Sequence, residues 1–368
     1  MSLKSSLLAT LVLLSGLAAP LVALADNAVY TQNNSVAGNA VLAFSRQADG
    51  SLTPAASYST GGTGTGSGLG SQGALAMSAN QRWLLVVNAG SNNISVLEIR
   101  PSGLVLTDKV WSGGARPISV TVDQNLVYVL NAGGGVGAAD NISGFYLTEK
   151  GKLLPIAQST RPLSAASVGP AQISFSPTGD QLMVTEKGTN LVDTFSVDDT
   201  GIAGWGNFTP SSGATPFGFA FTPSGVAVVS EAFGGAPFAS RLSSYALTSD
   251  GLPELITASL ATSQTAACWV AVARNGHFAY ATNTGSNTVT GVRVAKDGSL
   301  TLLGSGGVSA STGATPTDAA VSVNSQFLYV LNSGAHSISG YRIGAMGELE
   351  WVGEAGGLPA GSVGLVAR

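Results

Sequence analysis

The sequence predicts an all-β fold in which similar units follow one another along the chain. Short apolar stretches alternate with turns rich in Gly and Asn, and Gly alone contributes 49 of the 368 residues. No stretch keeps the 3.6-residue apolar period of an amphipathic helix over three turns. One line also returns: "NTGSNTVTGVRVAKDGSLTLL" from Asn283 resembles "NAGSNNISVLEIRPSGLVLT" from Asn88 and "NSGAHSISGYRIGAMGELEWV" from Asn332. Such self-similarity is the signature of a repeat architecture.

The repeat is best aligned on the end of its most apolar strand, which we call the anchor position. Seven copies can be aligned in this way: "VYTQN" at 29–33, "LLVVN" at 84–88, "VYVLN" at 127–131, "LMVTE" at 182–186, "VVSE" at 228–231, "YATN" at 280–283 and "LYVLN" at 328–332. Successive anchors are about 43 to 55 residues apart, close to the repeats of about 40–50 residues in propellers. We therefore predict a seven-bladed β-propeller.

Each copy contains four short strands joined by tight turns. In the sixth copy "CWVAVAR", "FAYATN", "TVTGVRV" and "LTLLGSG" follow one another, and the pairs Asn275-Gly276 and Asp297-Gly298 separate strands. Asn-Gly and Asp-Gly pairs favour antiparallel hairpins, because both residues tolerate the positive φ of tight turns. The blades are therefore predicted to be four-stranded and antiparallel.

The two ends of the chain predict how the ring closes. The first copy starts directly at its second strand, "AVYTQNN", with no innermost strand before it. The last residues, "LPAGSVGLVAR", resemble the innermost strands "ARPISVTVD" and "GPAQISFSP" of other copies. We expect the C-terminal strand to complete the first blade and remove an exposed sheet edge.

Residues 1–25 have the pattern of a removable export signal. Lys4 is followed by the apolar stretch "LLATLVLLSGLAA" and by small residues up to Ala25. We expect cleavage before Asp26, a single propeller domain over residues 26–368, and a periplasmic or secreted location. Every later apolar run ends in Gly, Asn or a charge well short of the roughly 18 residues of a membrane span.

Composition excludes several functional classes. Charged residues make up only 10% of the chain and the net charge is −4, so nucleic acid is not an expected partner. The single Cys268 cannot form an internal disulfide, and two His residues are too few for a zinc site with several His ligands. We expect a monomer that binds a small-molecule ligand or a protein outside the cytoplasm.

The repeats resemble the lactonase family of seven-bladed propellers, which includes a bacterial type of 6-phosphogluconolactonase and the carboxymuconate cyclases. "FSPTGDQLMVTEKGTN" and "ACWVAVARNGHFAYATNTGSNTVTGVRVAKDGSL" carry the resemblance, which extends over residues 27–368. It implies a site at the central channel built from basic residues after Pro in innermost strands and from a Glu that ends a second strand. Here Pro170, Pro216 and Pro316 are followed by no such basic residue, whereas Glu231 matches the acidic position.

The anchors are the first candidate site. Five are Asn (Asn33, Asn88, Asn131, Asn283 and Asn332) and two on adjacent blades are Glu186 and Glu231. Equivalent positions of a propeller lie on one ring, so we expect these side chains near one mouth of the channel. The alternative for the Asn residues is that they cap turns by bonding backbone groups.

Three interpretations of the glutamate pair stay open. Two converging carboxylates repel, which raises one pKa toward neutrality and suits an acid or base acting on a lactone. Gln172 could then hold the developing oxyanion, and Lys187 could recruit a carboxylate. The same oxygens could instead bind Ca²⁺ or Mg²⁺ at the channel mouth, although no other cofactor is expected. Both glutamates could also be solvated surface carboxylates, with Glu186 paired to Lys187.

The segment "GGTGTGSGLGSQG" at residues 61–73 contains the spacing GxGxxG. It connects two strands and does not open a helix, so a dinucleotide site lacks its structural context. We expect it to be a flexible connection between blades.

Two functions are compatible with the sequence. The first is a lactonase or cycloisomerase in which Glu231 and Glu186 are the acid and base, while Asn88, Asn131, Gln172, Asn283 and Asn332 position a small lactone or cyclic organic acid. The second is a non-catalytic platform that binds a protein, glycan or small ligand. The retained Glu231 favours the enzyme, and the missing basic residues favour the platform, because an anionic substrate would need them.

Overall fold

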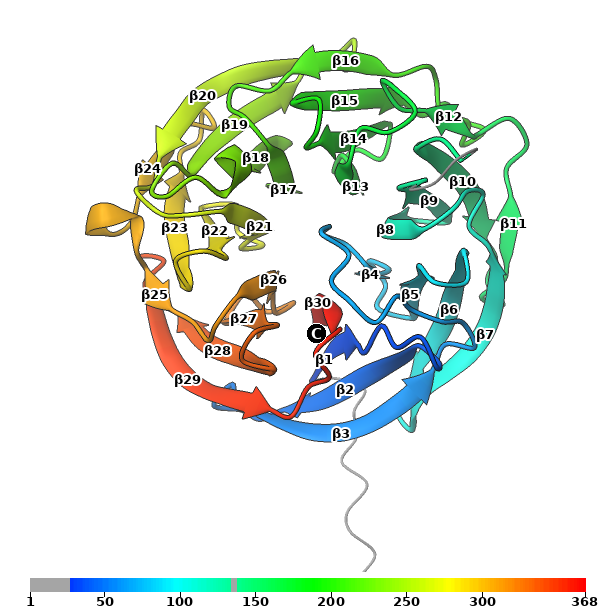
Figure 1. Ribbon diagram of the computed structural model, residues 1–368, viewed down its shortest axis with the longest axis horizontal. Helices are drawn as coiled ribbons and strands as arrows, with labels where there is room; N and C mark the ends of the chain where they lie inside the picture. The colour runs from blue at the N-terminus through cyan, green and yellow to red at the C-terminus, as the bar shows by residue number, and fades with distance from the viewer. Residues whose placement is uncertain (1–26, 134–137) are drawn as a thin grey trace, which may run out of the picture.

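Seven antiparallel sheets surround a central axis in the computed structural model, which describes residues 27–133 and 138–368 (Figure 1). The fold confirms the predicted seven-bladed propeller with four strands in each blade. Two blades carry one additional short strand, β12 and β25. The expected export signal, residues 1–25, lies outside the described residues.

In six blades the strands follow one another along the chain from the axis outward, whereas the first blade has β30 innermost, followed by β1, β2 and β3. The innermost strands are β4 (Leu75–Met77), β8 (Pro117–Asp123), β13 (Pro170–Phe175), β17 (Pro216–Phe221), β21 (Ala267–Val272), β26 (Pro316–Val321) and β30 (Val363–Ala367). The second strands, which end at or beside the anchors, are β1 (Ala28–Gln32), β5 (Trp83–Asn88), β9 (Leu126–Asn131), β14 (Gln181–Glu186), β18 (Val226–Glu231), β22 (Phe278–Asn283) and β27 (Phe327–Asn332).

The outer half of each blade contains the two remaining strands. The third strands are β2 (Ala40–Arg46), β6 (Asn93–Arg100), β10 (Asn141–Leu147), β15 (Leu191–Ser196), β19 (Arg241–Leu247), β23 (Thr288–Val294) and β28 (Ser337–Ile343). The outer strands are β3 (Leu52–Ser59), β7 (Gly103–Trp111), β11 (Leu153–Pro155) with β12 (Arg161–Pro162), β16 (Asn207–Pro210), β20 (Pro253–Ala261), β24 (Leu300–Leu302) with β25 (Ala310–Ser311), and β29 (Leu349–Gly356). Two short 3-10 turns, η1 (Phe233–Gly235) and η2 (Ser305–Gly307), lie in connections.

The C-terminal strand closes the ring, as the sequence predicts. Strand β30 pairs antiparallel with β1, with Ala367 opposite Val29 and Val363 opposite Gln32. The backbone N–H of Arg368 continues the pairing by donating to the carbonyl of Ala28 at 2.8 Å. Figure 1 shows the red C-terminal strand beside the dark blue first strand. The first blade is therefore made from both ends of the chain.

Neighbouring blades are held together by fully buried second strands. Tyr128, Tyr280 and Tyr329 occupy the position three residues before an anchor and are at most 1% exposed. Each phenol donates a hydrogen bond to a glycine carbonyl in a turn of the next blade, at 2.7 to 3.0 Å. A buried phenol needs such a partner, because an unpaired hydroxyl in an apolar core is costly. The repeated Tyr thus joins blades as well as filling the core.

Deleting residues 359–368 removes β30, so we expect the truncated chain to lose the cooperative unfolding transition of the full chain. The deletion leaves β1 with an unpaired edge and opens the apolar cluster around Phe44 and Tyr329. Leu365→Ala is a milder test within that cluster, with an expected loss of about 2–5 kcal/mol of unfolding free energy.

Urea unfolding followed by circular dichroism measures both effects. The exposed Val36→Ala is the control, with an expected change within about 0.5 kcal/mol. A truncated chain with the stability of the full protein would show that β30 does not close the ring.

Candidate functional site

The anchor residues lie at one end of the blades, and six of the seven are fully buried. Asn88, Asn131, Asn283 and Asn332 are all 0% exposed. Their Nδ2 groups donate to oxygens of the third strand: Asn88 to Asn93 and Ser95, Asn131 to Asn141 and Ser143, Asn283 to Thr288 and Thr290, and Asn332 to Ser337 and Ser339, at 2.7 to 3.3 Å. These amides join the second strand to the third. Their contact with a substrate stays a prediction.

The first copy departs from this arrangement. Asn33 is only half-buried, and its Oδ1 accepts hydrogen bonds from the backbone N–H groups of Ser35 and Ala40. This is the turn-capping role that the sequence left open. The fully buried position is filled instead by Gln32, whose Oε1 accepts from Nδ2 of Asn39 at 2.6 Å.

The anchors explain why a glycine recurs in the connections that precede several innermost strands. The turn between blades passes directly over the anchor side chain, and a Cβ on its glycine would lie 2.0 to 2.9 Å from it. The pairs are Gly62 with Asn88, Gly114 with Asn131, Gly213 with Glu231, and Gly313 with Asn332. These four anchors are therefore covered by backbone, which accounts for their burial.

Glu186 and Glu231 are also 0% exposed, and both are saturated with donors. Oε1 of Glu231 accepts from the Ser243 hydroxyl at 2.5 Å, and Oε2 accepts from the Ser259 hydroxyl at 2.6 Å. Oε1 of Glu186 accepts from the Ser164 N–H at 3.0 Å, and Oε2 accepts from the hydroxyls of Ser164 and Thr189. Both carboxylates therefore bind groups of the protein in this conformation, and neither meets solvent.

The two glutamates do not share a hydrogen-bonding partner among the described residues. Burial raises the pKa of Glu231, while its two serine donors and the charge of Arg241 act in the opposite direction. Glu186 lies instead beside two other acids, Asp193 on β15 and Asp140 in the preceding blade. The expected mutual repulsion of the two glutamates is thus replaced by a cluster around Glu186.

Asp193 is the residue of this cluster that the sequence analysis missed. It is 0% exposed, and neither of its carboxyl oxygens has a donor from the rest of the protein. Burial raises its pKa to about 10, and its contact with Glu186 acts in the same direction. A proton held on Asp193 would give this carboxyl a hydrogen that it can donate toward Glu186. Asp193 follows Glu186 by seven residues, as Ser95 follows Asn88, so the blade register could have identified it.

The glycine-rich segment is not the flexible connection that the sequence predicts. Its last part, residues 70–73, lies across the centre of the ring, where Figure 1 shows the blue chain before β4. The Ser71 hydroxyl donates to the carbonyl of Ile118 at 2.9 Å, and the Trp269 indole N–H donates to the carbonyl of Ser71 at 2.8 Å. We call residues 66–73 the plug.

Gln72 is the most strongly held residue of the plug. Its backbone N–H donates to Ala171 at 3.0 Å, and its side-chain amide makes two bonds to the backbone of Val270, at 2.7 and 3.0 Å. A Cβ on Gly218 would lie 2.2 Å from Oε1 of Gln72, so this blade needs a glycine there. Although Gln72 precedes the second blade, it therefore binds the fourth and sixth blades and packs on the fifth.

Lys187 and Gln172 lie next to the plug. The Lys187 ammonium group donates to the carbonyl of Gly70 and lies 4.8 Å from the centroid of the Phe217 ring. Burial lowers the pKa of Lys187 to about 8; Cys268 opposes this shift and the charge of Arg116 adds to it. Gln172 bonds both the N–H and the carbonyl of Phe219, at 2.7 and 2.9 Å, and so joins two innermost strands. The oxyanion role of Gln172 stays a prediction.

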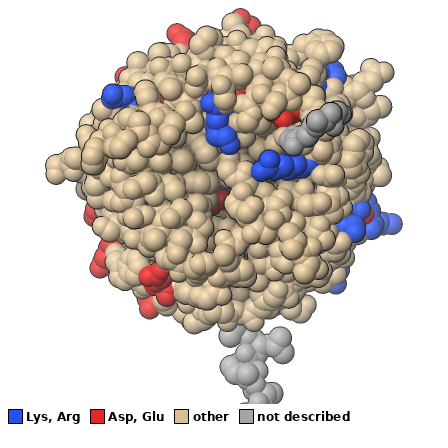
Figure 2. Space-filling view, in the orientation of Figure 1, with Lys and Arg blue, Asp and Glu red and all other residues tan. Residues whose placement is uncertain are grey.

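A pocket of about 240 Å³ lies between the plug and the closing end of the chain. Its walls are Gly68, Leu69, Gly70, Ser71, Trp269, Thr317, Ser333, Ala360, Ser362 and Val363. Figure 2 shows a central hollow with an acidic side chain inside and basic side chains beside it. None of the pocket residues was predicted from sequence to be a site residue, because they belong to five separate stretches of chain.

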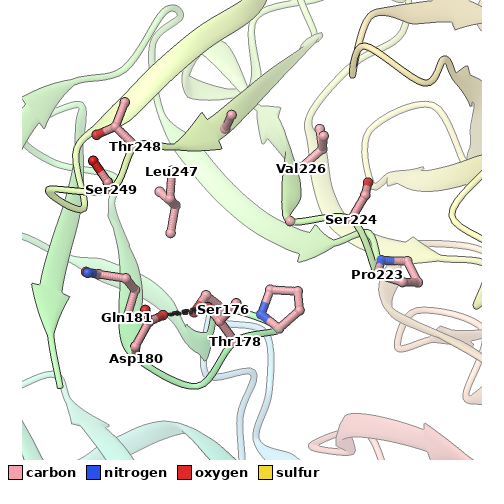
Figure 3. Close-up of a pocket in the computed structure, with 13 residues that line it drawn as sticks. Ser176, Thr178, Asp180, Gln181, Pro223, Ser224, Val226, Leu247, Thr248 and Ser249 are labelled. Atoms are coloured by element: carbon pink, nitrogen blue, oxygen red, sulfur yellow. Dashed lines mark hydrogen bonds between the residues drawn. The ribbon is translucent and has the colours of Figure 1, made fainter. Parts of the chain in front are cut away.

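A second pocket of about 330 Å³ lies between the fourth and fifth blades at the end opposite the anchors (Figure 3). Ser176, Thr178, Asp180, Pro223 and Thr248 are among the residues that line it, and the Ser176 hydroxyl bonds the Asp180 carboxylate at 3.3 Å. None of the site residues predicted from sequence lies there.

Among the described residues, no group of three or more His, Cys, Asp or Glu side chains could hold a metal ion. The described part of the chain also contains no helix long and apolar enough to cross a membrane.

The ring and its closing strand define a seven-bladed β-propeller. A family model described as lactonase, 7-bladed beta-propeller, matches residues 36–161 and 243–363. The chain belongs to this family. No curated protein sequence matches it.

Several solved structures share the fold. A periplasmic gluconolactonase from Pseudomonas aeruginosa is 16% identical, with a TM-score of 0.72, and the match covers 92% of this chain and 98% of that one. A candidate 6-phosphogluconolactonase from Bacteroides uniformis is 18% identical, with a TM-score of 0.70 and coverage of 92% and 99%. A Lactobacillus plantarum protein is 18% identical, with a TM-score of 0.73 and coverage of 93% and 99%.

Replacing Asp193 with Asn should raise stability, and the gain should grow with pH. The raised pKa means that folded Asp193 keeps a proton that the unfolded chain releases near pH 4. The wild type therefore loses stability as the pH rises from about 4 toward 10. Asn keeps a donor for Glu186 and has no proton to lose, so the pH dependence should flatten.

Urea midpoints at pH 5, 7 and 9 measure this difference, with Asn at the exposed Asp199 as the matched control. An equal loss of stability at all three pH values would contradict a protonated Asp193.

Replacing Gln72 with Ala should lower the unfolding free energy by about 1–3 kcal/mol, since it leaves the buried N–H and carbonyl of Val270 unpaired. The exposed Gln47→Ala is the control, with an expected change below about 0.5 kcal/mol. Equal stability of the two variants would mean that the plug is held by other contacts.

Proposed function

We propose that the protein is an exported, lactonase-like propeller that binds a small lactone or cyclic organic acid at the centre of the ring and hydrolyses or isomerises it. The observation that carries the proposal is the pocket beside the plug, in a chain that belongs to the lactonase family. The name of the Pseudomonas aeruginosa neighbour, a periplasmic gluconolactonase, supports both the substrate class and the location. Export rests on the signal pattern of residues 1–25.

Lys187 is the cation best placed to attract a carboxylate or a polarised carbonyl. It lies beside the plug, with Arg116 close enough to affect its pKa. Because that pKa is about 8, the charge is present at neutral pH and is lost above pH 8. Binding of a ring-opened acid product should therefore weaken as the pH rises through 8.

Glu231 and Glu186 remain the proposed acid and base. The raised pKa of Glu231 brings it nearer to neutrality, where proton transfer is efficient. Each must exchange a serine hydroxyl for substrate before it can act, because the hydroxyls of Ser259 and Ser164 occupy its oxygens. Catalysis by Glu231 thus requires an opening of the turn at Gly213 that covers it, and catalysis by Glu186 requires displacement of Ser164.

A second candidate is a non-catalytic platform for a protein, glycan or small ligand. The complete burial of Glu231 and Glu186 favours it, because a structural carboxylate needs no access to substrate. The two candidates differ in turnover and not in fold.

Turnover of a lactone panel, followed by proton release, distinguishes them. The panel also includes unsaturated cyclic acids, followed by ultraviolet absorbance for isomerisation. We expect wild-type turnover of at least one compound and a loss of about 100-fold or more in the double variant Glu186→Gln, Glu231→Gln.

The exposed pair Glu149→Gln, Glu254→Gln is the matched control and should keep wild-type activity. Circular dichroism establishes that both double variants are folded. Absence of turnover on the whole panel would favour the platform, and full activity in a folded Glu186, Glu231 double variant would remove both glutamates from the mechanism.

A further inference from the structure

A pocket of about 480 Å³ lies at the rim of the ring, between the sixth and seventh blades. One wall is β25 with the turn that follows it, and the other contains Tyr341 of β28 together with Leu349, Trp351 and Glu354 of β29. Figure 1 shows β25 beside β29 on the outside of the ring. This rim pocket therefore lies away from the central axis, and none of the candidate site residues lines it.

The register of the seventh blade places the side chains of this wall on one face. Trp351 pairs with Tyr341, and Glu354 pairs with Ser339, two positions away on β28. Trp351 and Glu354 are three residues apart, so a regular strand would direct them to opposite faces. An additional residue of β29, Val352, forms a β-bulge between them. The bulge thus brings the indole and the carboxylate into the same pocket.

Trp351 gives the pocket an accessible aromatic surface, because the residue is 52% exposed. Tyr341 holds it in place: the two ring centroids are 5.5 Å apart and the rings are inclined by 72°. The Tyr341 hydroxyl in turn donates to the carbonyl of Ser311 on β25 at 2.5 Å, so the phenol links the two walls. The face of an indole carries negative potential and attracts cations more strongly than the other aromatic side chains do.

Glu354 adds a full negative charge to the same wall. It is exposed and has no ion-pair partner among the described residues. Burial raises the pKa of Tyr341 to about 12; the contact with Ser339 opposes this shift and the charge of Glu354 adds to it, so the carboxylate lies near the phenol. No Lys or Arg from the described part of the chain lines the pocket. Its negative charge is therefore uncompensated.

The one basic residue of the β28–β29 hairpin lies on the other face. Arg342 pairs with Glu350 in the sheet, and its Nε lies 3.9 Å from that carboxylate. Its guanidinium group lies 4.9 Å from the centroid of the Phe327 ring and donates to the carbonyl of Asp49 in the first blade. On the face of the molecule that Figure 2 shows, this lower left part of the rim carries acidic and no basic side chains.

Size and chemistry limit the ligand. A volume of about 480 Å³ lies within the range of about 300–1,000 Å³ of small-molecule pockets. The walls formed by Trp351 and Leu349 favour a cation with carbon substituents, because the strongly hydrated ammonium group of an ordinary amine gives up more hydration in such surroundings. Aromatic side chains recognise quaternary ammonium groups in this way.

We propose that the rim pocket between β25 and β29 binds a small organic cation, a methyl-substituted ammonium compound, through the indole of Trp351 and the carboxylate of Glu354. The site is separate from the proposed lactone site and does not depend on it. It gives the protein a second class of ligand, opposite in charge to the acids expected at the centre of the ring.

Choline and its uncharged carbon analogue, 3,3-dimethylbutan-1-ol, test the proposal because they have nearly the same shape and differ in charge. Nuclear magnetic resonance of protein labelled with ¹⁵N in its five Trp residues follows each indole N–H, and the variant Trp351→Leu identifies the signal of Trp351. We expect choline to shift this signal and to bind at least about fivefold more tightly than the alcohol. The Trp269 signal reports on the central pocket and should stay unchanged.

Isothermal titration of variants measures the two contacts. Trp351→Leu should weaken choline binding about 2- to 30-fold. Glu354→Gln should weaken it about 2- to 5-fold and reduce the loss of affinity that added salt causes. Trp111→Leu and Glu350→Gln are the matched controls, since Trp111 is 67% exposed on the second blade and Glu350 lies on the other face of β29. Both should bind choline as the wild type does.

Three results would overturn the proposal: an unchanged Trp351 signal in the presence of choline, equal affinity for choline and the alcohol, or choline affinities of the two folded pocket variants equal to those of the controls. A shift of the Trp269 signal without one of Trp351 would also reject the rim pocket, because it would place choline at the centre of the ring. The assay involves no lactone, so failure of this site leaves the proposed function intact, and absence of lactone turnover leaves this site intact.

Discussion

The pairing of β30 with β1 is the constraint on which the rest of the structure depends. It brings the last residues of the chain to the first, and the apolar side chains of Leu365 and Ala367 complete a cluster shared by the first and seventh blades. Every other blade is continuous in sequence, so only this one depends on a contact between distant ends. The pocket wall at Ser362 and Val363 exists because the chain returns to the axis at this point.

Each blade is also held together by polar contacts between its second and third strands, and the donor and acceptor in these contacts depend on whether the anchor is Asn or Glu. An Asn anchor donates through its amide, so its partners on the third strand are hydroxyl or amide oxygens, as at Ser95 and Thr290. A Glu anchor can only accept, so its partner must carry a proton. Ser243 meets that need at Glu231 with a hydroxyl, and the corresponding position at Glu186 holds Asp193, whose pKa burial raises to about 10. The exchange of an Asn anchor for Glu186 thus accounts for the buried acid Asp193 in the fourth blade.

The fold could be predicted from sequence because it is specified by local, repeated signals. A turn pair such as Asn275-Gly276 is visible in two consecutive residues, and the structure gives Gly276 the positive φ of 73° that such a turn requires. The absence of an innermost strand at the start of the first copy is visible in the same direct way. The anchors could be located at one end of the blades for the same reason. Their burial could not be predicted, since it depends on the turn of the preceding blade that passes over each side chain. The central pocket was missed because Trp269, Thr317 and Ser362 meet only when the ring is closed.

The plug shows how composition can mislead. A run of glycines predicts freedom of movement, yet glycine also lets backbone approach backbone closely, and here it lets one connection reach several blades. Gly64, in the same connection just before the plug, is an example, because a Cβ there would lie 2.1 Å from the backbone of Asn34. In evolutionary terms, the stretch that resembles a tolerant spacer is therefore constrained in length, since any gain or loss of a residue would move Gln72 away from Val270 and Ala171.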